Sequence, residues 1–431
     1  MQLLLNTGLR KTVVIVAATV ATAALAFPLW RYFRVDRLEA AGSPSSLQRA
    51  IALQPDNPDL YNRLGLLFLF SDDDNSKRAL AVLQKATQLN PYSGAYWVDL
   101  AVAREQQGDL SGADQALQSA RRIESNTPNV LWQDMNFALR TQQTDRALRD
   151  GRELLAKASE YTGRVLSQLA PVMPVPTLVR DVLPATLRSF SDAIEIITKQ
   201  NHMDAAGVLW TRILALNEAP ITYYLKALLD GALEAGDVSL AQRVWADALT
   251  RGWIAGDVTT ARQPLYNGDF HHPFLNYGFD WRIVPQPDTS VWLEGQGPMP
   301  GLQSLCVEFS DKARAGFAHI AHAIPVEPNT FYTLHGYLRT KRLSSPGGAY
   351  LQVAEALPRA GQVSTTSPVM GTGGWREVAL RLRTGSETRM VQLSLVRPGV
   401  GSGEAAASGQ VCMAALEWTS LGQASAPGAA R

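Results

Sequence analysis

Three short stretches recur at an interval of 34 residues, and each carries an alanine at the same place: Lys77–Leu80 (KRAL), Ser111–Asp114 (SGAD) and Asp145–Leu148 (DRAL). The alanines are Ala79, Ala113 and Ala147. A second pattern, AIALQP at 50–55, recurs as ATQLNP at 86–91. Two antiparallel helices approach closely only where small residues face each other, and a proline ends a helix. The spacing therefore predicts a series of helical hairpins.

The predicted repeats occupy residues 36–262, with one interruption. After Leu155 the prolines are too closely spaced for regular hairpins, and the next alanine in register, Ala206, follows Ala147 by 59 residues. The period then resumes, because Ala241 lies 35 residues after Ala206. We therefore expect about five hairpins and one irregular insertion.

Both the period and a signature in the first helix of each hairpin resemble the tetratricopeptide repeat. The matching residues are Tyr61, Leu64 and Gly65, and then Trp97, Leu100 and Ala101. The resemblance implies an all-α solenoid whose concave face binds a protein partner. The alternative is a spacer, or a solenoid that packs on the rest of the chain and binds nothing.

The N-terminal region, residues 1–35, contains an uncharged apolar stretch at residues 12–30. A helix of this length measures about 28 Å, close to the thickness of a bilayer core. Arg10 and Lys11 favour a cytoplasmic N-terminus, so we expect a single-pass protein of the bacterial inner membrane with its bulk in the periplasm. One alternative is a signal peptide cleaved after the small-x-small site Ala24–Ala26, and another is a buried soluble helix.

In residues 263–424 the sequence pattern changes to short runs in which apolar residues alternate with others, separated by Gly, Pro, Asn and Ser. Residues 425–431 are expected to form a disordered tail. The clearest runs are Leu305-Val307-Phe309, Tyr332-Leu334-Gly336-Leu338 and Val378-Leu380-Leu382. Alternation of this kind is typical of strands with one buried face. We therefore expect an all-β jelly-roll sandwich.

This region resembles the galactose-binding-like carbohydrate-binding modules in the order of its motifs. The motifs are Asn267–Phe270, Tyr277–Trp281, Gln303–Val307, Val326–Tyr332 and Gly374–Val378. The resemblance implies a glycan-binding surface built on aromatic rings. One departure concerns calcium, since Ala414 and Ala415 stand where that family often has acidic ligands, and we expect no calcium.

Aromatic residues are the candidates for contact with a sugar ring. We expect Trp292, Tyr350 and Tyr277 to face ligand, whereas Trp281, Trp375 and Trp418 match core positions of the family pattern. The two cysteines, Cys306 and Cys412, either form a disulfide or stay as two separate buried thiols. Sequence leaves both possibilities open.

The net charge and the absence of several catalytic motifs disfavour some classes of function. Forty Lys and Arg against 39 Asp and Glu give a net charge of +1, which disfavours a nucleic-acid partner. The sequence contains no serine-hydrolase elbow, phosphate loop or His-Glu-x-x-His motif. His319 and His322 are predicted on opposite faces of one strand, so they make a poor metal pair. We predict no catalytic residue, no metal and no cofactor.

Together these features predict a non-catalytic adaptor anchored in the cell envelope. Its repeats would bind a protein and its sandwich a glycan or protein, by analogy in exopolysaccharide or O-antigen assembly or export. One alternative is a scaffold that binds only proteins. Another is an accessory module of a carbohydrate-active enzyme, which would need a carboxylate pair in a cleft.

Overall fold

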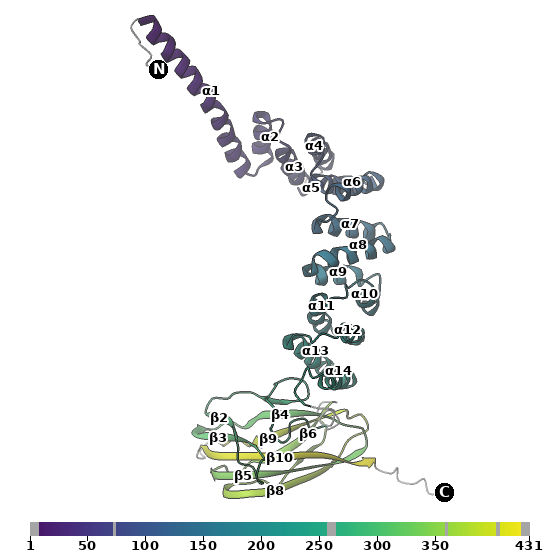
Figure 1. The fold of residues 1–431 in the computed structure, drawn as a ribbon, viewed down its shortest axis with the longest axis vertical. Coiled ribbons are helices and arrows are strands. Elements are labelled where there is room, and N and C mark those ends of the chain that lie inside the picture. The colour runs from purple at the N-terminus through teal and green to yellow at the C-terminus, as the bar shows by residue number, and fades with distance from the viewer. Residues whose placement is uncertain (1–7, 72–74, 257–263, 358–360, 402–405, 424–431) are drawn as a thin grey trace, which may run out of the picture. The chain divides into compact units, whose positions relative to one another are not determined.

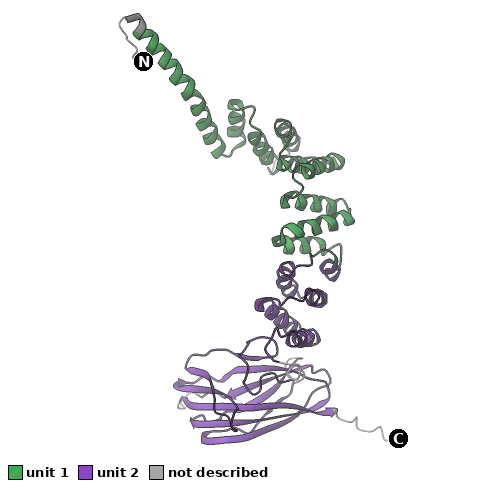
Figure 2. Cartoon of the chain, in the orientation of Figure 1, with its two compact units in different colours: residues 1–173, 181–184 green, residues 174–180, 185–431 purple. Residues whose placement is uncertain are grey.

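The computed structural model describes residues 8–71, 75–256, 264–357, 361–401 and 406–423. Helices come first in the chain and strands second, and the expected fold class is confirmed (Figure 1). The chain divides into two compact units, one of residues 1–173 and 181–184, the other of residues 174–180 and 185–431 (Figure 2). Each unit is described separately below.

The first unit contains a long N-terminal helix followed by stacked hairpins. Its helices are α1 (Gly8–Ala40), α2 (Pro44–Leu53), α3 (Pro58–Leu69), α4 (Ser76–Leu89), α5 (Gly94–Gln106), α6 (Leu110–Ile123), α7 (Pro128–Arg140), α8 (Thr144–Lys157), a 3-10 turn (Ser159–Tyr161) and α9 (Thr162–Leu169). The predicted hairpins are the pairs α3–α4, α5–α6 and α7–α8. Ala79, Ala113 and Ala147 lie in the second helices and are fully buried.

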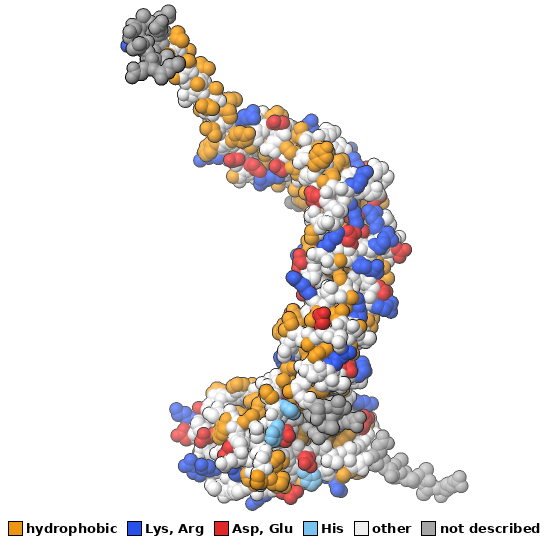
Figure 3. Space-filling view, viewed as in Figure 1, with side chains coloured by type: hydrophobic (Ala, Val, Ile, Leu, Met, Phe, Trp, Pro, Cys, Tyr) orange, Lys and Arg blue, Asp and Glu red, His pale blue; other side chains and the backbone are white. Residues whose placement is uncertain are grey.

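Helix α1 does not end where its apolar stretch ends. It runs for 33 residues, and its last turns pair with α2 as the first hairpin of the solenoid, ahead of α3–α4. Val35 is only 3% exposed in the solenoid core, and Glu39 pairs with Arg63 of α3. Of the described helices, this one is long and apolar enough to cross a membrane. Exposed hydrophobic side chains occur along this helix between Val13 and Phe33 (Figure 3).

The second unit opens with five more helices. They are α10 (Val175–Asp181), α11 (Leu187–Lys199), α12 (Met203–Leu216), α13 (Thr222–Glu234) and α14 (Val238–Thr250). Ala206 on α12 and Ala241 on α14 are fully buried. The proline-rich interruption forms short helices, since α9 and α10 have 8 and 7 residues.

Ten strands follow in the described part of the chain and form two five-stranded antiparallel sheets. They are β1 (Trp281–Ile283), β2 (Thr289–Glu294), β3 (Ser304–Ala313), β4 (Phe317–Pro325), β5 (Thr330–Leu343), β6 (Tyr350–Leu357), β7 (Val363–Thr365), β8 (Gly371–Arg383), β9 (Met390–Arg397) and β10 (Ala407–Gln423). Sheet A has the order β1-β4-β9-β6-β7, and sheet B has the order β2-β3-β10-β5-β8. Alternate side chains of both sheets fill one core between them.

Helix α13 is joined to the sandwich by a half-buried ion pair. Asp230 accepts hydrogen bonds from Arg282 of β1 at 2.5 Å and from the backbone N–H of Gly278 at 3.0 Å, and it pairs with Lys226 at 2.7 Å. Burial opposes ionisation, but these donors hold the pKa of Asp230 below its usual value. The last helices of the second unit and the sandwich are therefore packed together.

Aromatic packing completes this junction. Trp245 of α14 contacts the rings of Tyr266 and Phe279 edge-on, with centroids 5.2 and 5.9 Å apart. Gly278 has a positive φ of 58°, and a Cβ there would lie 2.8 Å from the Trp245 ring. Only glycine fits this position.

The helix contact at Gly65 gives a stability prediction. A Cβ on Gly65 of α3 would lie 2.4 Å from Cγ of the fully buried Leu83 of α4. Gly65→Ala should therefore destabilise the chain by about 1 kcal/mol, because overpacking outweighs the gain in helix propensity. The readout is the midpoint of thermal unfolding, followed by helical circular dichroism of the full chain in detergent.

Gly207→Ala on α12 is the matched control. Its Cβ would meet Leu240 at 3.9 Å, an ordinary contact, so the same substitution should stabilise by about 0.5–1 kcal/mol. Equal stabilisation by both substitutions would contradict the close contact at Gly65.

Candidate functional site

The outer face of sheet B carries a row of side chains that crosses all five strands. Trp292 on β2 pairs with Cys306 on β3, Cys306 pairs with Cys412 on β10, and Cys412 pairs with Arg339 on β5. The Arg339 guanidinium lies 4.8 Å from the ring centroid of Trp375 on β8. Residues paired across antiparallel strands share a face, so these five side chains form one surface, here called the cross-strand row.

The row ends in two half-buried tryptophans, Trp292 and Trp375, whereas Cys306 and Cys412 between them are fully buried. Its five strands are separated by four inter-strand steps, or about 19 Å in all. The flanking residues of the same strands, Leu305, Leu338 and Met413, point into the core. One set of alternate side chains of sheet B thus packs in the core, and the cross-strand row lies on the opposite, outer face of the sheet.

The centre of the row is fixed by covalent and ionic contacts. Cys306 and Cys412 form a disulfide with Cα atoms 4.0 Å apart. Glu294, two residues after Trp292, pairs with Arg339 and lies 3.2 Å from the Cys306 sulfur. Gln410 donates a hydrogen bond to the Cys412 sulfur at 3.0 Å. These contacts hold the polar groups between the two tryptophans.

Trp292 and Tyr350 do not lie on one surface. Tyr350 on β6 pairs with Val396 of β9 and occupies the outer face of sheet A, because its neighbours Leu351 and Val353 point into the core. Trp292 is on the outer face of sheet B. The two candidates therefore face opposite sides of the sandwich and cannot contact one ligand.

Tyr277 is not available for stacking on a sugar. Its side chain is 4% exposed in the junction with α13, where Lys226 lies 5.9 Å from its ring centroid. The expectation that Tyr277 faces ligand is wrong, because helix packing covers the loop that carries it.

The tryptophans expected in the core divide into two groups. Trp281 and Trp418 are 0% and 7% exposed and lie in the core, whereas Trp375 is half-buried on the outer face. The expectation for Trp375 is wrong. The alternation of Val378, Leu380 and Leu382, continued toward the N-terminus of β8, already puts residue 375 on the side away from the core.

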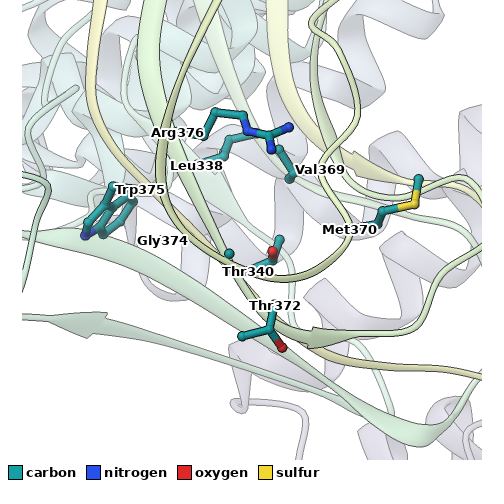
Figure 4. A pocket seen from close by; sticks show the side chains of 9 residues that line it. Leu338, Thr340, Val369, Met370, Thr372, Gly374, Trp375 and Arg376 are labelled. Atoms are coloured by element: carbon teal, nitrogen blue, oxygen red, sulfur yellow. The ribbon is translucent and has the colours of Figure 1, made fainter.

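A pocket of about 330 Å³ opens at the edge of the sandwich beside β8. Figure 4 shows Leu338, Val369 and Arg376 gathered on one side of the strand, while Trp375 lies apart from them. The pocket also includes Met370, which is 55% exposed. Trp375 is also among the residues that line this pocket, so it belongs to both the pocket and the cross-strand row.

One group of possible metal ligands occurs among the described residues, formed by Glu294, Cys306 and Cys412. The two sulfurs are bonded to each other. Metal ligation by cysteine requires a thiolate, so this group does not fit a metal in the disulfide form. His319 and His322 both lie on β4, with His322 buried in the interior and His319 half-exposed.

The two parts of the chain are similar to two different kinds of solved structure. The structure of YrrB, a TPR protein with an unusual peptide-binding site, is 16% identical, covers 47% of this chain and 98% of its own, with a TM-score of 0.29. TTC0263, a thermophilic TPR protein of Thermus thermophilus, is 21% identical over 29% of this chain and 71% of its own, with a TM-score of 0.27.

A structure of a CBM4 module is 15% identical and covers 36% of this chain and 99% of its own, with a TM-score of 0.26. No protein-family model matches the sequence, and the comparison with curated proteins gives no match. The helical part is thus similar to tetratricopeptide repeat structures and the sandwich to a carbohydrate-binding module. The order and pairing of the elements described above carry the fold assignment.

Two buried titratable groups lie at the start of sheet A. Burial raises the pKa of Asp280 to about 6, although the carboxylate accepts a hydrogen bond from the backbone N–H of Leu275. Burial lowers the pKa of His322 to about 4, and its Nε2 contacts the carbonyl of Tyr266 at 3.0 Å. The folded state thus favours the neutral form of both groups.

These two groups predict opposite dependences of stability on pH. The raised pKa of Asp280 gives a contribution that is present below about pH 4 and lost as the pH rises through about 6. The lowered pKa of His322 gives a contribution that is present above about pH 6.5 and lost as the pH falls through about 4. Their slopes should largely cancel between pH 4 and 6.5.

Two neutral substitutions should separate the slopes. Asp280→Asn should make the free energy of unfolding increase as the pH rises from 4 to 6.5, and His322→Gln should make it decrease, each by on the order of 2 kcal/mol. Urea unfolding followed by tryptophan fluorescence at several pH values measures both. Parallel pH profiles for the wild type and the two variants would rule out this assignment.

Proposed function

We propose that this chain is a non-catalytic, single-pass membrane adaptor of the cell envelope, whose repeats bind a protein and whose sandwich binds a glycan on the outer face of sheet B. The cross-strand row is the observation that supports glycan binding most directly. Two tryptophan faces stand at its ends, and Glu294, Arg339 and Gln410 supply hydrogen-bonding groups between them. Apolar rings with a few placed polar groups are the usual construction of a sugar site.

The fixed geometry of the row also supports a binding role. The disulfide ties β3 to β10, and the Glu294–Arg339 pair connects β2 with β5. The groups that would meet a ligand are thus ordered before it arrives, which reduces the entropy lost on binding.

The helical half supports the adaptor role by its construction. Successive first helices are connected by polar contacts, since Asn62 of α3 donates to Asp99 of α5 at 2.8 Å and Arg140 of α7 pairs with Glu105 of α5 at 2.6 Å. Such contacts hold neighbouring hairpins in a fixed register, as a surface for an extended partner requires. We assign the protein partner to this surface, and the placement of α1 ahead of it suits a membrane anchor.

Glycan binding is tested with the full chain in lipid nanodiscs on an array of bacterial and plant polysaccharides. Trp292→Ala and Trp375→Ala should each weaken binding to any captured glycan about tenfold, because each removes one stacking face. Tyr350→Ala is the matched control, since Tyr350 is a half-buried aromatic residue on the outer face of sheet A. It should leave binding unchanged.

Two outcomes would overturn this assignment. If no polysaccharide binds while the chain still captures an envelope protein, the sandwich is a protein-binding scaffold. If Tyr350→Ala abolishes binding and the two tryptophan substitutions do not, the glycan site lies on sheet A.

Anchoring is tested with an epitope tag placed before Met1. If residues 12–30 span the membrane without cleavage, the tag should stay on the full-length chain in the membrane fraction after carbonate extraction. External protease added to spheroplasts should then degrade the repeats and the sandwich. Release of an untagged chain into the soluble fraction would instead indicate cleavage.

A further inference from the structure

A second pocket, of about 230 Å³, lies at one end of the sandwich. The turn between β3 and β4 forms one wall, the end of β9 forms the floor, and the residues before and at the start of β2 form the rim. The residues used below are Asp288, Thr289, Ala315, Gly316, His319 and Arg397. This volume is below the roughly 300–1,000 Å³ of sites for drug-sized ligands, so it suits one small group.

The floor of this pocket contains a buried cation without a counter-ion. Arg397 is 2% exposed, and none of the ion pairs found among the described residues includes it. Its guanidinium donates to the carbonyls of Pro398, at 3.2 Å, and Ala315, while Nε has no partner. One face of the group lies over the ring of Phe309, at 4.7 Å from the centroid.

This arrangement is energetically unfavourable without an anion. Removing a guanidinium from water costs several kcal/mol unless an opposite charge or a full set of acceptors replaces the water. Two carbonyls and one aromatic face offset part of that cost. Burial also lowers the pKa of Arg397. A carboxylate in the pocket would supply the missing charge and an acceptor.

A second unpartnered group faces the same pocket. His319 Nδ1 is buried and makes no hydrogen bond, and its ring packs against Phe317 at a centroid distance of 5.3 Å. The close approach of the turn to β9 depends on two glycines, since a Cβ on Gly316 would lie 3.3 Å from the Gly399 nitrogen. This approach brings the Ala315 carbonyl onto the guanidinium.

We propose that this pocket binds the carboxylate of an acidic sugar, with Arg397 as the cation that recognises it. The choice of a sugar rests on the proposed function, whereas the choice of an anion rests on the unpaired arginine. Thr289 of the rim and Trp292 of the cross-strand row lie on the same strand, roughly 10 Å apart along it. A uronic acid residue in the pocket thus extends the glycan contact from the face of sheet B to the end of the sandwich.

The exposed Asp288 at the rim gives the proposal a test that does not depend on the buried arginine. Its carboxylate opposes an incoming anion, so Asp288→Asn should strengthen binding of D-glucuronate about threefold. Arg397→Gln should weaken it at least about tenfold, and Arg397→Lys should fall between Arg397→Gln and the wild type, because lysine keeps the charge but not the planar fork.

The experiment is a saturation-transfer NMR titration of the full chain in detergent micelles with D-glucuronate, and with D-glucose as the neutral control. The proposal expects glucuronate to bind and glucose to bind much more weakly. Tyr350→Ala, on the outer face of sheet A, is the control and should leave binding of glucuronate unchanged, whereas Asp288→Asn changes a residue of this pocket alone.

Three results would overturn the proposal. They are equal binding of glucose and glucuronate, no gain from Asp288→Asn, and capture of a peptide with a free C-terminal carboxylate in preference to glucuronate. A chain that binds neutral polysaccharide through Trp292 and Trp375 but fails these tests would retain the proposed function and lose only the acidic-sugar pocket.

Discussion

The alternation of side chains along the strands is the constraint on which the functional part of this molecule depends. A sandwich of two sheets needs one set of side chains from each strand for its core, and only the other set can meet a ligand. In sheet B the core takes Leu305, Leu338 and Met413, and this leaves the cross-strand row outside. The row exists because paired residues of β2, β3, β10 and β5 point outward side by side, and Trp375 of β8 lies against Arg339.

The helices at the junction decide which other parts of the sandwich stay open. Asp230 and Trp245 contact the loop before β1 and the outward residue Arg282, so this edge of sheet A is occupied by the chain's own helices. Tyr277, in the loop before β1, is buried there. The glycan surface proposed above lies on the other sheet, where Trp292 and Trp375 are half-buried on the outer face of sheet B.

Sequence reasoning reached the fold because both of its signals are local. The 34-residue interval of Ala79, Ala113 and Ala147 arises because the same helix–helix contact is repeated in each hairpin. The alternation at residues 378–382 arises because one face of the strand is buried. Placing the candidate site needed strand order, which is not local. Trp292 and Tyr350 belong to different sheets, and no spacing between them shows this.

The sequence also could not predict the environment of residues that is set by a tertiary contact. The burial of Tyr277 requires that α13 docks on the sandwich, and the unpaired state of Arg397 requires that the β3–β4 turn crosses β9. Trp375 is different, since continuing the alternation of its own strand predicts the outer face. At Trp375 the resemblance to carbohydrate-binding modules predicts the core and the alternation of β8 predicts the outer face. The half-buried, outward position of Trp375 agrees with the alternation.

The continuity of helix α1 connects the anchor to the repeats more directly than a linker would. If residues 12–30 span the bilayer, Val35 lies only five residues beyond Trp30, or about 7.5 Å along the helix axis. Val35 is already part of the solenoid core. The first hairpin must then begin within the headgroup region of the membrane. Because a helix transmits rotation as well as position, the face of the first hairpin that meets the lipid is set by the orientation of the span.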